Sequence, residues 1–238
     1  MLRLQNISIA LRDKNYSNKN PDKNSDENLR GGNLKGKRFL LKDFSVELSG
    51  GDFLCVKGRS GSGKSTLLSF IGGFIDHSVF FTSGTIELNQ KNITNLPVEK
   101  RGVGILFQDY LLFPHMTIEE NLLFALREQL SFDEKKDKVI NCLKDIGLSG
   151  FSKRDPTTLS GGEQARVALM RALINNPTCI LLDEPFSKLD KDLRKEMRDL
   201  FFSIIWKKKI PTVLVTHDLE DLPPKKSGLS IKEIYLGE

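Results

Sequence analysis

One stretch of the sequence decides the fold: Phe53-Leu54-Cys55-Val56-Lys57-Gly58-Arg59-Ser60-Gly61-Ser62-Gly63-Lys64-Ser65-Thr66. Its first four residues are apolar and typical of a short buried strand, and a helical run follows from Leu67. The glycines between them let the backbone turn inward, so its N–H groups converge at a helix N-terminus, where the dipole favours negative charge. The stretch predicts a phosphate-binding loop between a strand and a helix.

Residues 58–66 also satisfy the pattern G-x-x-x-x-G-K-[ST]. In such a loop, Lys64 is placed to reach the β- and γ-phosphates of a nucleotide, and the Ser65 hydroxyl to ligate Mg²⁺. An ordinary glycine turn is the alternative, but the strand before the loop and the helix after it favour nucleotide binding.

A second apolar run, Cys179 to Leu182, ends in the acids Asp183 and Glu184. This places Asp183 at the carboxyl edge of a sheet, where α/β proteins bind their ligands. Asp183 is typical of a ligand to a metal-bound water, and Glu184 of a base that orients and polarises an attacking water. The alternative is a structural role, in which the two acids only cap the next turn. A phosphate-binding loop in the same chain favours the catalytic role.

Short runs rich in β-formers at 103–107, 179–182 and 212–216 alternate with helical stretches. Near-continuous apolar strands separated by helices predict an α/β fold with a mainly parallel sheet. Residues 2–11 and 39–48 alternate apolar and polar side chains, which predicts half-exposed strands. The polar segment 13–37 between them predicts a surface insertion. Helical stretches at 118–127 and 133–146 predict a helical subdomain.

The composition excludes several classes of protein. Of 238 residues, 39% are hydrophobic and 28% charged, which excludes a disordered or fibrous chain. The sequence contains no run of 18 uncharged apolar residues, so it predicts no membrane-spanning helix. Residues 1–6 lack the apolar core of a signal peptide. Three isolated cysteines favour neither disulfides nor a zinc site, and we expect them to be buried apolar groups. The net charge of +5 suits an anionic ligand, nucleic acid or an acidic membrane surface alike.

The stretch Leu159-Ser160-Gly161-Gly162-Glu163-Gln164-Ala165-Arg166-Val167-Ala168-Leu169-Met170-Arg171-Ala172-Leu173 resembles the signature motif of ABC-type ATPases. Ser160 and the two glycines at the start of an amphipathic helix form a second anion-binding terminus. In that family this terminus completes the ATP site of a partner subunit, so the resemblance implies a head-to-tail nucleotide-sandwich dimer. Taken alone, a simple helix cap would explain Ser160, Gly161 and Gly162.

Other motifs follow in the family order. Gln108 resembles the Q-loop glutamine, which contacts Mg²⁺ and relays the nucleotide state to the helical subdomain. Asp190, in Ser187-Lys188-Leu189-Asp190, resembles the D-loop acid at the dimer interface. His217 resembles the switch histidine, which bonds the γ-phosphate and the water held by Glu184. A structural histidine after an apolar strand is the commoner case for an isolated residue.

The resemblance implies one ABC ATPase domain over residues 1–238, with a polar surface insertion at 13–37 and a helical subdomain with the signature motif at 109–160. Its fold would be a P-loop NTPase core with a mainly parallel sheet, N-terminal antiparallel strands and the inserted helical subdomain. ATP and Mg²⁺ would be its cofactors.

The function implied is ATP hydrolysis that powers a membrane ABC transporter. The segment 108–117 resembles bacterial importer subunits, most of all the thiamine-importer and YnjD-type groups. The expected partners are a second copy, transmembrane permease subunits that contact Phe113 and Met116, and a periplasmic binding protein through the permease. We expect a cytoplasmic protein, peripheral on the inner face of the cell membrane, that does not bind nucleic acid directly.

Two alternatives stay open. One is the ATPase of an exporter or of a lipoprotein-releasing or cell-division complex, and the other is an ABC ATPase that acts on nucleic acid. The sequence also departs from the family at two places. Leu11 stands where an aromatic residue usually stacks on adenine, with Tyr16 and Phe39 as substitutes, and Glu163 stands where many importers have Gln.

Overall fold

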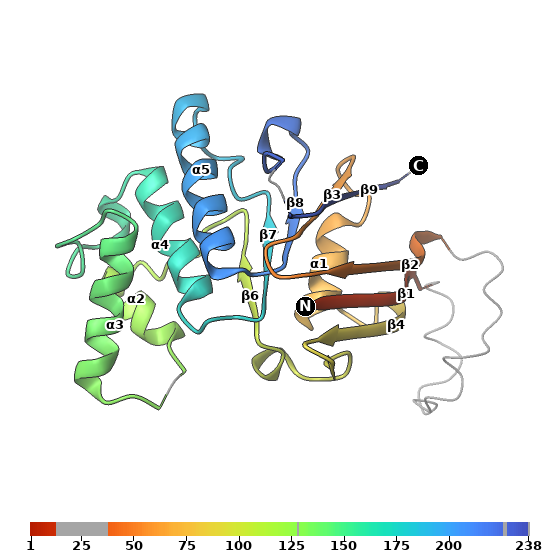
Figure 1. Ribbon diagram of the computed structural model, residues 1–238, viewed down its shortest axis with the longest axis horizontal. Helices are drawn as coiled ribbons and strands as arrows, with labels where there is room; N and C mark the ends of the chain where they lie inside the picture. The colour runs from red at the N-terminus through yellow and green to blue at the C-terminus, as the bar shows by residue number, and fades with distance from the viewer. Residues whose placement is uncertain (13–37, 128, 226–227, 238) are drawn as a thin grey trace.

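The computed structural model describes residues 1–12, 38–127, 129–225 and 228–237 (Figure 1). The predicted insertion at 13–37 and Tyr16 therefore lie outside the described residues. In chain order the elements are β1 (Leu2–Leu11), β2 (Phe39–Leu48), β3 (Phe53–Gly58), α1 (Lys64–Gly72), β4 (Phe80–Leu88), β5 (Lys91–Asn92), η2 (Val98–Lys100), β6 (Val103–Leu106), α2 (Ile118–Ala125), α3 (Phe132–Asp145), η3 (Pro156–Thr158), α4 (Gly161–Leu173), β7 (Cys179–Asp183), α5 (Lys191–Lys208), β8 (Thr212–Val215), η4 (Leu219–Asp221) and β9 (Ile231–Leu236).

A parallel sheet forms the centre of the molecule, with strand order β6-β7-β8-β3-β9. Alternate residues of β3 face opposite sides: Leu54 and Val56 belong to one core cluster, and Phe53 and Cys55 to another. Burial on both faces explains why these strands are apolar along their whole length. The predicted α/β class is confirmed, although β4, β5 and β9 were not predicted as separate strands.

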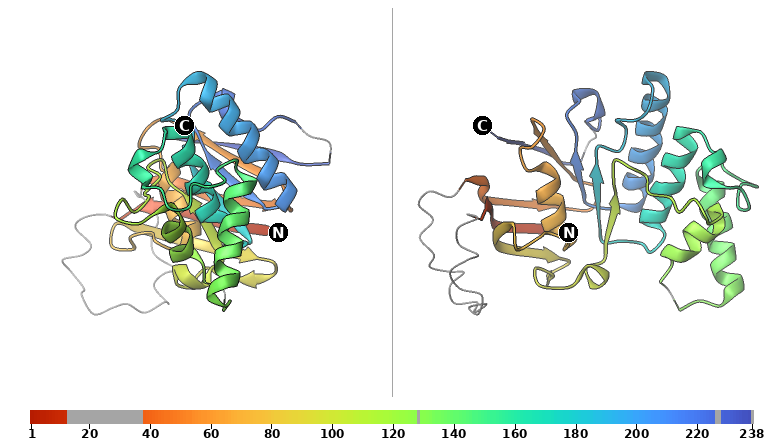
Figure 2. Two further views of the ribbon diagram at one scale, coloured as in Figure 1. Left: turned by 90° about the vertical axis from the view of Figure 1, so that its left-hand side faces the viewer. Right: turned by 180° about the vertical axis from the view of Figure 1, so that it is seen from behind.

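Helices and a second sheet cover the two faces of the parallel sheet. Helix α1 packs in the cluster that joins the two sheets, whereas α4 and α5 pack on the opposite face. Figure 1 shows the helices α2, α3 and α4 at one end and the antiparallel strands at the other, with the parallel sheet between them. The view from behind in Figure 2 shows the same order.

The antiparallel sheet has the order β2-β1-β4-β5, so β1 is an inner strand and is more buried than the half-exposed strand we predicted. The alternation of buried and exposed side chains along β1 changes phase between Leu4 and Ile7. At this point the register with β2 shifts, and Asn6 has a φ of 52°. The shift turns residues on both sides of it toward the same core. Opposite it, a Cβ on Gly84 would lie 2.6 Å from the Asn6 carbonyl oxygen, so only glycine fits there.

A third core cluster joins α2, α3 and one face of α4. Thr117 and Ser131 begin α2 and α3 with reciprocal capping boxes, as does Ser160 for α4. The observed helices agree with the helical stretches predicted at 118–127 and 133–146. Because the cluster includes Val167 and Met170, the core of this region extends beyond residue 160. The division of the chain at 109 and 160 stays a prediction.

Two further expectations concern membranes and cysteines. Within the described residues, every helix is too short or too polar to cross a bilayer. Cys55 and Cys179 are buried, as expected, whereas Cys142 is half-buried, and none of the three forms a disulfide.

Candidate nucleotide-binding site

The glycine loop lies between β3 and α1, as predicted, and three of its glycines have positive φ values. They are 145° at Gly58, 76° at Gly61 and 101° at Gly63. A Cβ on Gly58 would lie 2.3 Å from the Leu236 carbonyl oxygen, so the end of β9 leaves no room for a side chain there. The loop is thus held open toward the N-terminus of α1 by conformations that favour glycine.

Lys64 spans this loop from the first position of α1. It is 7% exposed, and its Nζ donates hydrogen bonds of 3.0 Å to the Gly58 carbonyl and 3.1 Å to the Arg59 carbonyl. The Oγ of Ser62 is buried and makes no hydrogen bond within the described part of the chain. A positive charge and an unpaired hydroxyl are therefore available to an anionic ligand. Arg59 and Ser60 are exposed, and Thr66 is half-buried.

Ser65 and Asp183 meet at the carboxyl edge of the parallel sheet. The Ser65 hydroxyl lies 3.3 Å from Asp183 Oδ1 and donates to it. Burial raises the pKa of the Asp183 carboxyl above its usual range, with a contribution from the charge of Glu184 and opposition from Ser65 and Lys64. A hydroxyl and a carboxylate are oxygen donors of the kind that Mg²⁺ prefers. These residues therefore fit a magnesium ion.

Glu184 follows β7 in a left-handed backbone conformation, with a φ of 45°. Its N–H donates to the Val215 carbonyl at 3.0 Å, and its carbonyl accepts from the Ser187 hydroxyl at 2.9 Å. Such a conformation costs a non-glycine residue roughly 1 to 2 kcal/mol. Its carboxylate lies 3.1 Å from Nδ1 of His217, which follows β8. Backbone bonds and the histidine together fix where the carboxylate points.

Gln108 leaves the sheet at the same edge. Because β6 pairs with β7 in parallel register, with Leu106 opposite Leu182, Gln108 lies beside the end of β7 and is exposed. The next residue, Asp109, forms an exposed ion pair with Lys188, two residues before Asp190. Asp190 is exposed and caps α5, where its Oδ1 accepts from the Leu193 N–H at 3.0 Å.

The signature residues lie apart from the glycine loop. Ser160 caps α4, followed by Gly161, which is exposed, and Gly162, which is buried. Since α1 and α4 pack on opposite faces of the parallel sheet, the chain does not bring its two anion-binding termini together. Glu163 completes the capping box: its carboxylate accepts from the Ser160 N–H at 2.8 Å. That bond and one from the Ser160 hydroxyl lower the pKa of Glu163.

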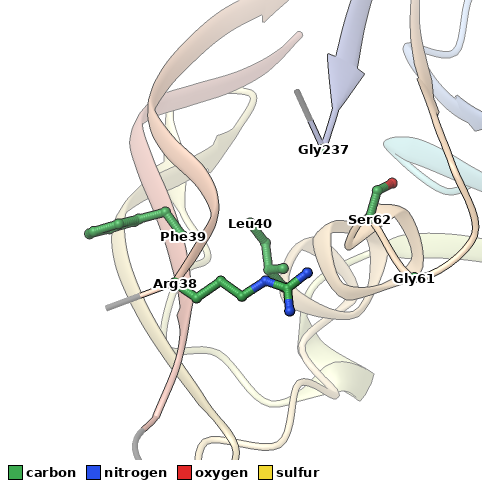
Figure 3. Close-up of a pocket in the computed structure, with 6 residues that line it drawn as sticks. All are labelled: Arg38, Phe39, Leu40, Gly61, Ser62 and Gly237. Carbon is green, nitrogen blue, oxygen red and sulfur yellow. The ribbon is translucent and has the colours of Figure 1, made fainter. Parts of the chain in front are cut away.

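A cavity of about 230 Å³ adjoins the glycine loop (Figure 3). Its lining consists of Arg38, Phe39, Leu40, Gly61, Ser62 and Gly237. Figure 3 shows the Arg38 side chain extended toward the loop, whereas the Phe39 ring points away from it. Leu11, which stands at the position of the family's aromatic residue, is half-buried and donates its N–H to the Arg38 carbonyl. The side chains that face the loop here are therefore the Arg38 guanidinium and Leu40, which packs against Gly63.

Sequence reasoning missed Arg38 and a buried ion-pair network between α5 and the residues after β8. Arg38 directly follows the polar segment, where no periodic pattern marks it. In the network, Arg194 binds Asp218 and Asp221, which the sequence separates from it by more than 20 positions. The charges themselves were visible, but their pairing depends on the tertiary fold.

A family model described as ABC transporter matches residues 41–187, and the chain belongs to this family. Among its relatives, "Uncharacterized ABC transporter ATP-binding protein YnjD" of Escherichia coli (strain K12) is 43% identical over 194 residues, 82% of this chain and 89% of that protein. "Spermidine/putrescine import ATP-binding protein PotA" of Aggregatibacter actinomycetemcomitans is 42% identical over 187 residues, 78% of this chain. The chain spans about half of PotA, since the match covers 49% of that protein.

A solved structure described as "Dimeric structure of a post-hydrolysis state of the ATP-binding cassette MJ0796 bound to ADP and Pi" matches with a TM-score of 0.68 and 29% identity. The match covers 93% of this chain and 90% of that one. The chain is therefore an ATP-binding, ATP-hydrolysing subunit of an ABC transporter.

Proposed function

We propose that this chain powers a bacterial small-molecule importer as a head-to-tail dimer on the cytoplasmic face of the membrane. The observation that carries the proposal is the separation of the glycine loop from the signature helix on opposite faces of one sheet. In a head-to-tail dimer the N-terminus of α4 in one copy would face the glycine loop of the other, so both termini would bind one nucleotide. The dimeric cassettes among the structural neighbours support this arrangement.

The triphosphate would lie along the glycine loop. Its negative charge would be balanced by Lys64, by the backbone N–H groups and, from the second copy, by Ser160 and Gly161. Ser65 and Asp183 would hold Mg²⁺, with Gln108 at the same edge. When bound, the metal neutralises charge on the phosphate oxygens.

Hydrolysis needs a water held in line with the bond between the γ-phosphate and ADP. Glu184 is placed to orient that water and to accept its proton as the water oxygen bonds to the γ-phosphorus and the bond to ADP breaks. His217, 3.1 Å from the Glu184 carboxylate, would bond both the water and a γ-phosphate oxygen. Catalysis of this kind rests on positioning and on charge neutralisation, and the products are ADP and inorganic phosphate.

The adenine base would lie in the cavity beside the glycine loop. Arg38 is the candidate for its stacking partner, because guanidinium groups stack on aromatic rings and this side chain faces the loop. Leu40 would supply apolar contact. Phe39 points away, and Tyr16 lies outside the described residues.

The permease would dock on an apolar surface beside Gln108. Leu111 is 57% exposed and Phe124 is 65% exposed, and the Phe124 ring contacts that of Phe113 with centroids 5.0 Å apart. Arg171 fixes this segment, because its guanidinium donates to the Leu111 carbonyl at 2.7 Å. Met116 is half-buried. Contact here would transmit closure of the dimer to the permease, which in turn would meet the binding protein, and no contact with nucleic acid is needed.

The Glu184→Gln variant tests this function. It keeps an oxygen that can hold water but loses the base, so we expect it to bind ATP without turnover and to accumulate as a dimer. Light scattering should show a mass twice the 26.9 kDa of one chain when ATP is present. Lys64→Ala is the control, and we expect it to stay monomeric because it binds the triphosphate weakly. Unchanged turnover in Glu184→Gln, or a monomer with bound ATP, would contradict the proposal.

A further inference from the structure

A buried ion-pair network holds the turn that carries His217. The carboxylate of Asp221 is only 2% exposed, and it accepts from Arg194 Nε at 2.8 Å and from the Thr216 hydroxyl at 2.9 Å. Nη2 of Arg194 also pairs with Asp221, at 2.5 Å, and the third guanidinium nitrogen, Nη1, lies 3.0 Å from Asp218 Oδ2. Asp218 is therefore tied directly to Arg194. Thr216 is tied to it through Asp221, which Arg198 Nη1 also approaches at 3.7 Å.

Further hydrogen bonds, outside this ion-pair network, also hold the turn that carries His217. Thr216 is 1% exposed, and its hydroxyl also accepts from the Asp218 N–H at 3.1 Å. The Thr216 N–H bonds to the Val56 carbonyl of β3 at 3.3 Å. The His217 side chain itself is 59% exposed, and within the described residues it contacts the Glu184 carboxylate. Its position is therefore set mostly by the backbone on either side of it.

Arg194 lies in the first turn of α5, the helix that Asp190 caps. Its own N–H donates to the Asp190 carbonyl at 2.8 Å, while its side chain reaches the histidine turn. One residue thus contacts the segment expected at the dimer interface and the segment that carries the histidine.

We propose that Arg194 is a positioning residue for hydrolysis, which fixes the His217 turn to helix α5 and so holds the imidazole against Glu184. The inference rests on the proposed roles of His217 and Glu184. A movement of Asp190 on dimer closure would reach the histidine through this side chain.

The chemistry of the network requires arginine. The planar fork of a guanidinium binds two carboxylates with defined directions, whereas an ammonium is a single point charge. Lysine at position 194 would still compensate the buried charge of Asp221, so the fold should survive, because the strongest penalty comes from leaving such a charge unpaired. It would not hold Asp218 and Asp221 at once, and the turn would gain freedom.

The test compares Arg194→Lys, His217→Ala and the double variant of the full chain, by ATP affinity at equilibrium and by the rate of a single turnover. We expect Arg194→Lys to bind ATP within about twofold of wild type and to hydrolyse it on the order of tenfold more slowly, since small misplacements of catalytic groups have effects of this size or larger. In the His217→Ala background the same change should slow hydrolysis less than twofold, roughly, because its effect passes through the histidine.

Asp218→Asn gives an independent measurement, because it removes the charge that pairs with Arg194 Nη1, keeps the Oδ1 that accepts from the Glu220 N–H at 2.9 Å, and leaves the pair between Arg194 and Asp221 intact. We expect slower hydrolysis with unchanged ATP affinity.

Arg3→Lys is the matched control: Arg3 also pairs with two carboxylates, Glu47 at 3.1 Å and Glu87 at 3.6 Å, but lies in the antiparallel sheet away from the histidine turn. It should hydrolyse ATP at the wild-type rate.

Wild-type hydrolysis in both Arg194→Lys and Asp218→Asn would overturn the inference, as would an Arg194→Lys effect that multiplies with that of His217→Ala. A loss of ATP affinity that matches the loss of rate would also overturn it, because that is the result of a merely structural role. Full hydrolysis in His217→Ala would instead show that the proposed function assigns the histidine wrongly. The two failures are therefore distinct.

Discussion

Arg38 is the proposed stacking partner of adenine, in place of the aromatic residue expected from the family, and its side chain extends toward the glycine loop. If its guanidinium stacks on the base, Arg38→Ala should weaken ATP binding on the order of fivefold to thirtyfold, since a partly desolvated cation–π contact contributes about 1 to 2 kcal/mol. Binding of inorganic tripolyphosphate should not change, because that ligand has no base. Titration calorimetry with both ligands measures the difference.

Phe39→Ala and Tyr16→Ala are the competing variants. We expect little effect from Phe39→Ala because the ring points away from the loop and lies near Lys42, whose Nζ is 5.7 Å from its centroid. Equal weakening of ATP and tripolyphosphate in Arg38→Ala would show that Arg38 binds phosphate instead. A larger effect of either competing variant would assign the base to that aromatic ring.

Four of the residues predicted for the site share a property. Asp183 is the last residue of strand β7, and Lys64, Glu184 and His217 follow β3, β7 and β8 closely in the chain. The element itself therefore determines where each residue lies. Neither Arg38 nor Asp221 directly follows an element that the sequence pattern predicts in this way. Their positions depend on how strands and helices distant in the sequence pack, which local periodicity does not encode.

At the scale of elements, the start of α4 explains the unusual Glu163. Glu163→Ala should lower the free energy of unfolding by about 0.3 to 1.5 kcal/mol, the usual range for a single capping interaction. Glu163→Gln keeps an acceptor for the Ser160 N–H and loses only the charge near the positive end of the helix. Its free energy of unfolding should therefore fall by only about a few tenths of a kcal/mol. Urea unfolding measures both.

The small difference in the free energy of unfolding between wild type and Glu163→Gln should depend on pH. Because the Ser160 N–H and hydroxyl lower the folded-state pKa of Glu163, its charge stabilises the fold fully above the unfolded value of about 4.3. That stabilisation is lost as the pH falls through the lowered value. We expect the difference to vanish in acid, and a difference independent of pH would contradict the charge as its cause.

Helices and strands were predicted from the sequence where a local pattern of side chains was enough to identify them. The apolar strands of the parallel sheet and the helices α2 and α3 could be predicted because burial on both faces and helical periodicity leave local marks in the sequence. Strand β1 was predicted too, but not its depth of burial. Its change of phase at Asn6 depends on Gly84, which lies in a different strand and allows the backbones to approach closely.

At the scale of the whole molecule, the proposed dimer makes a mixing prediction. Gly161→Asp should leave the single chain folded, because a Cβ at Gly161 has its nearest neighbour at 3.6 Å, but its carboxylate would repel a phosphate bound by the partner. Lys64→Ala disables the glycine loop. Each variant alone should be inactive, whereas an equal mixture should regain ATPase activity, since mixed dimers contain one site with both parts intact.

The control for this experiment is a mixture of Lys64→Ala with Glu184→Gln. Both changes lie on the glycine-loop side of the site, so neither site of a mixed dimer is intact and no activity should return. Recovery there, or its absence in the first mixture, would contradict a site shared between copies. The sequence predicted this arrangement only through resemblance, because the separation of the two anion-binding termini depends on the tertiary fold.

The position of β3 in the sheet has a consequence for how the protein is made. This strand, which leads into the glycine loop, lies between β8 and β9, and the Ser230 N–H that bonds the Asp52 carboxylate beside it is 178 positions further along the chain. During synthesis, that distance corresponds to on the order of ten seconds of translation. Contacts so distant in sequence also form slowly. The nascent chain therefore carries its glycine loop beside an incomplete sheet for most of its synthesis, and nucleotide can stabilise the fold only at the last stage of assembly.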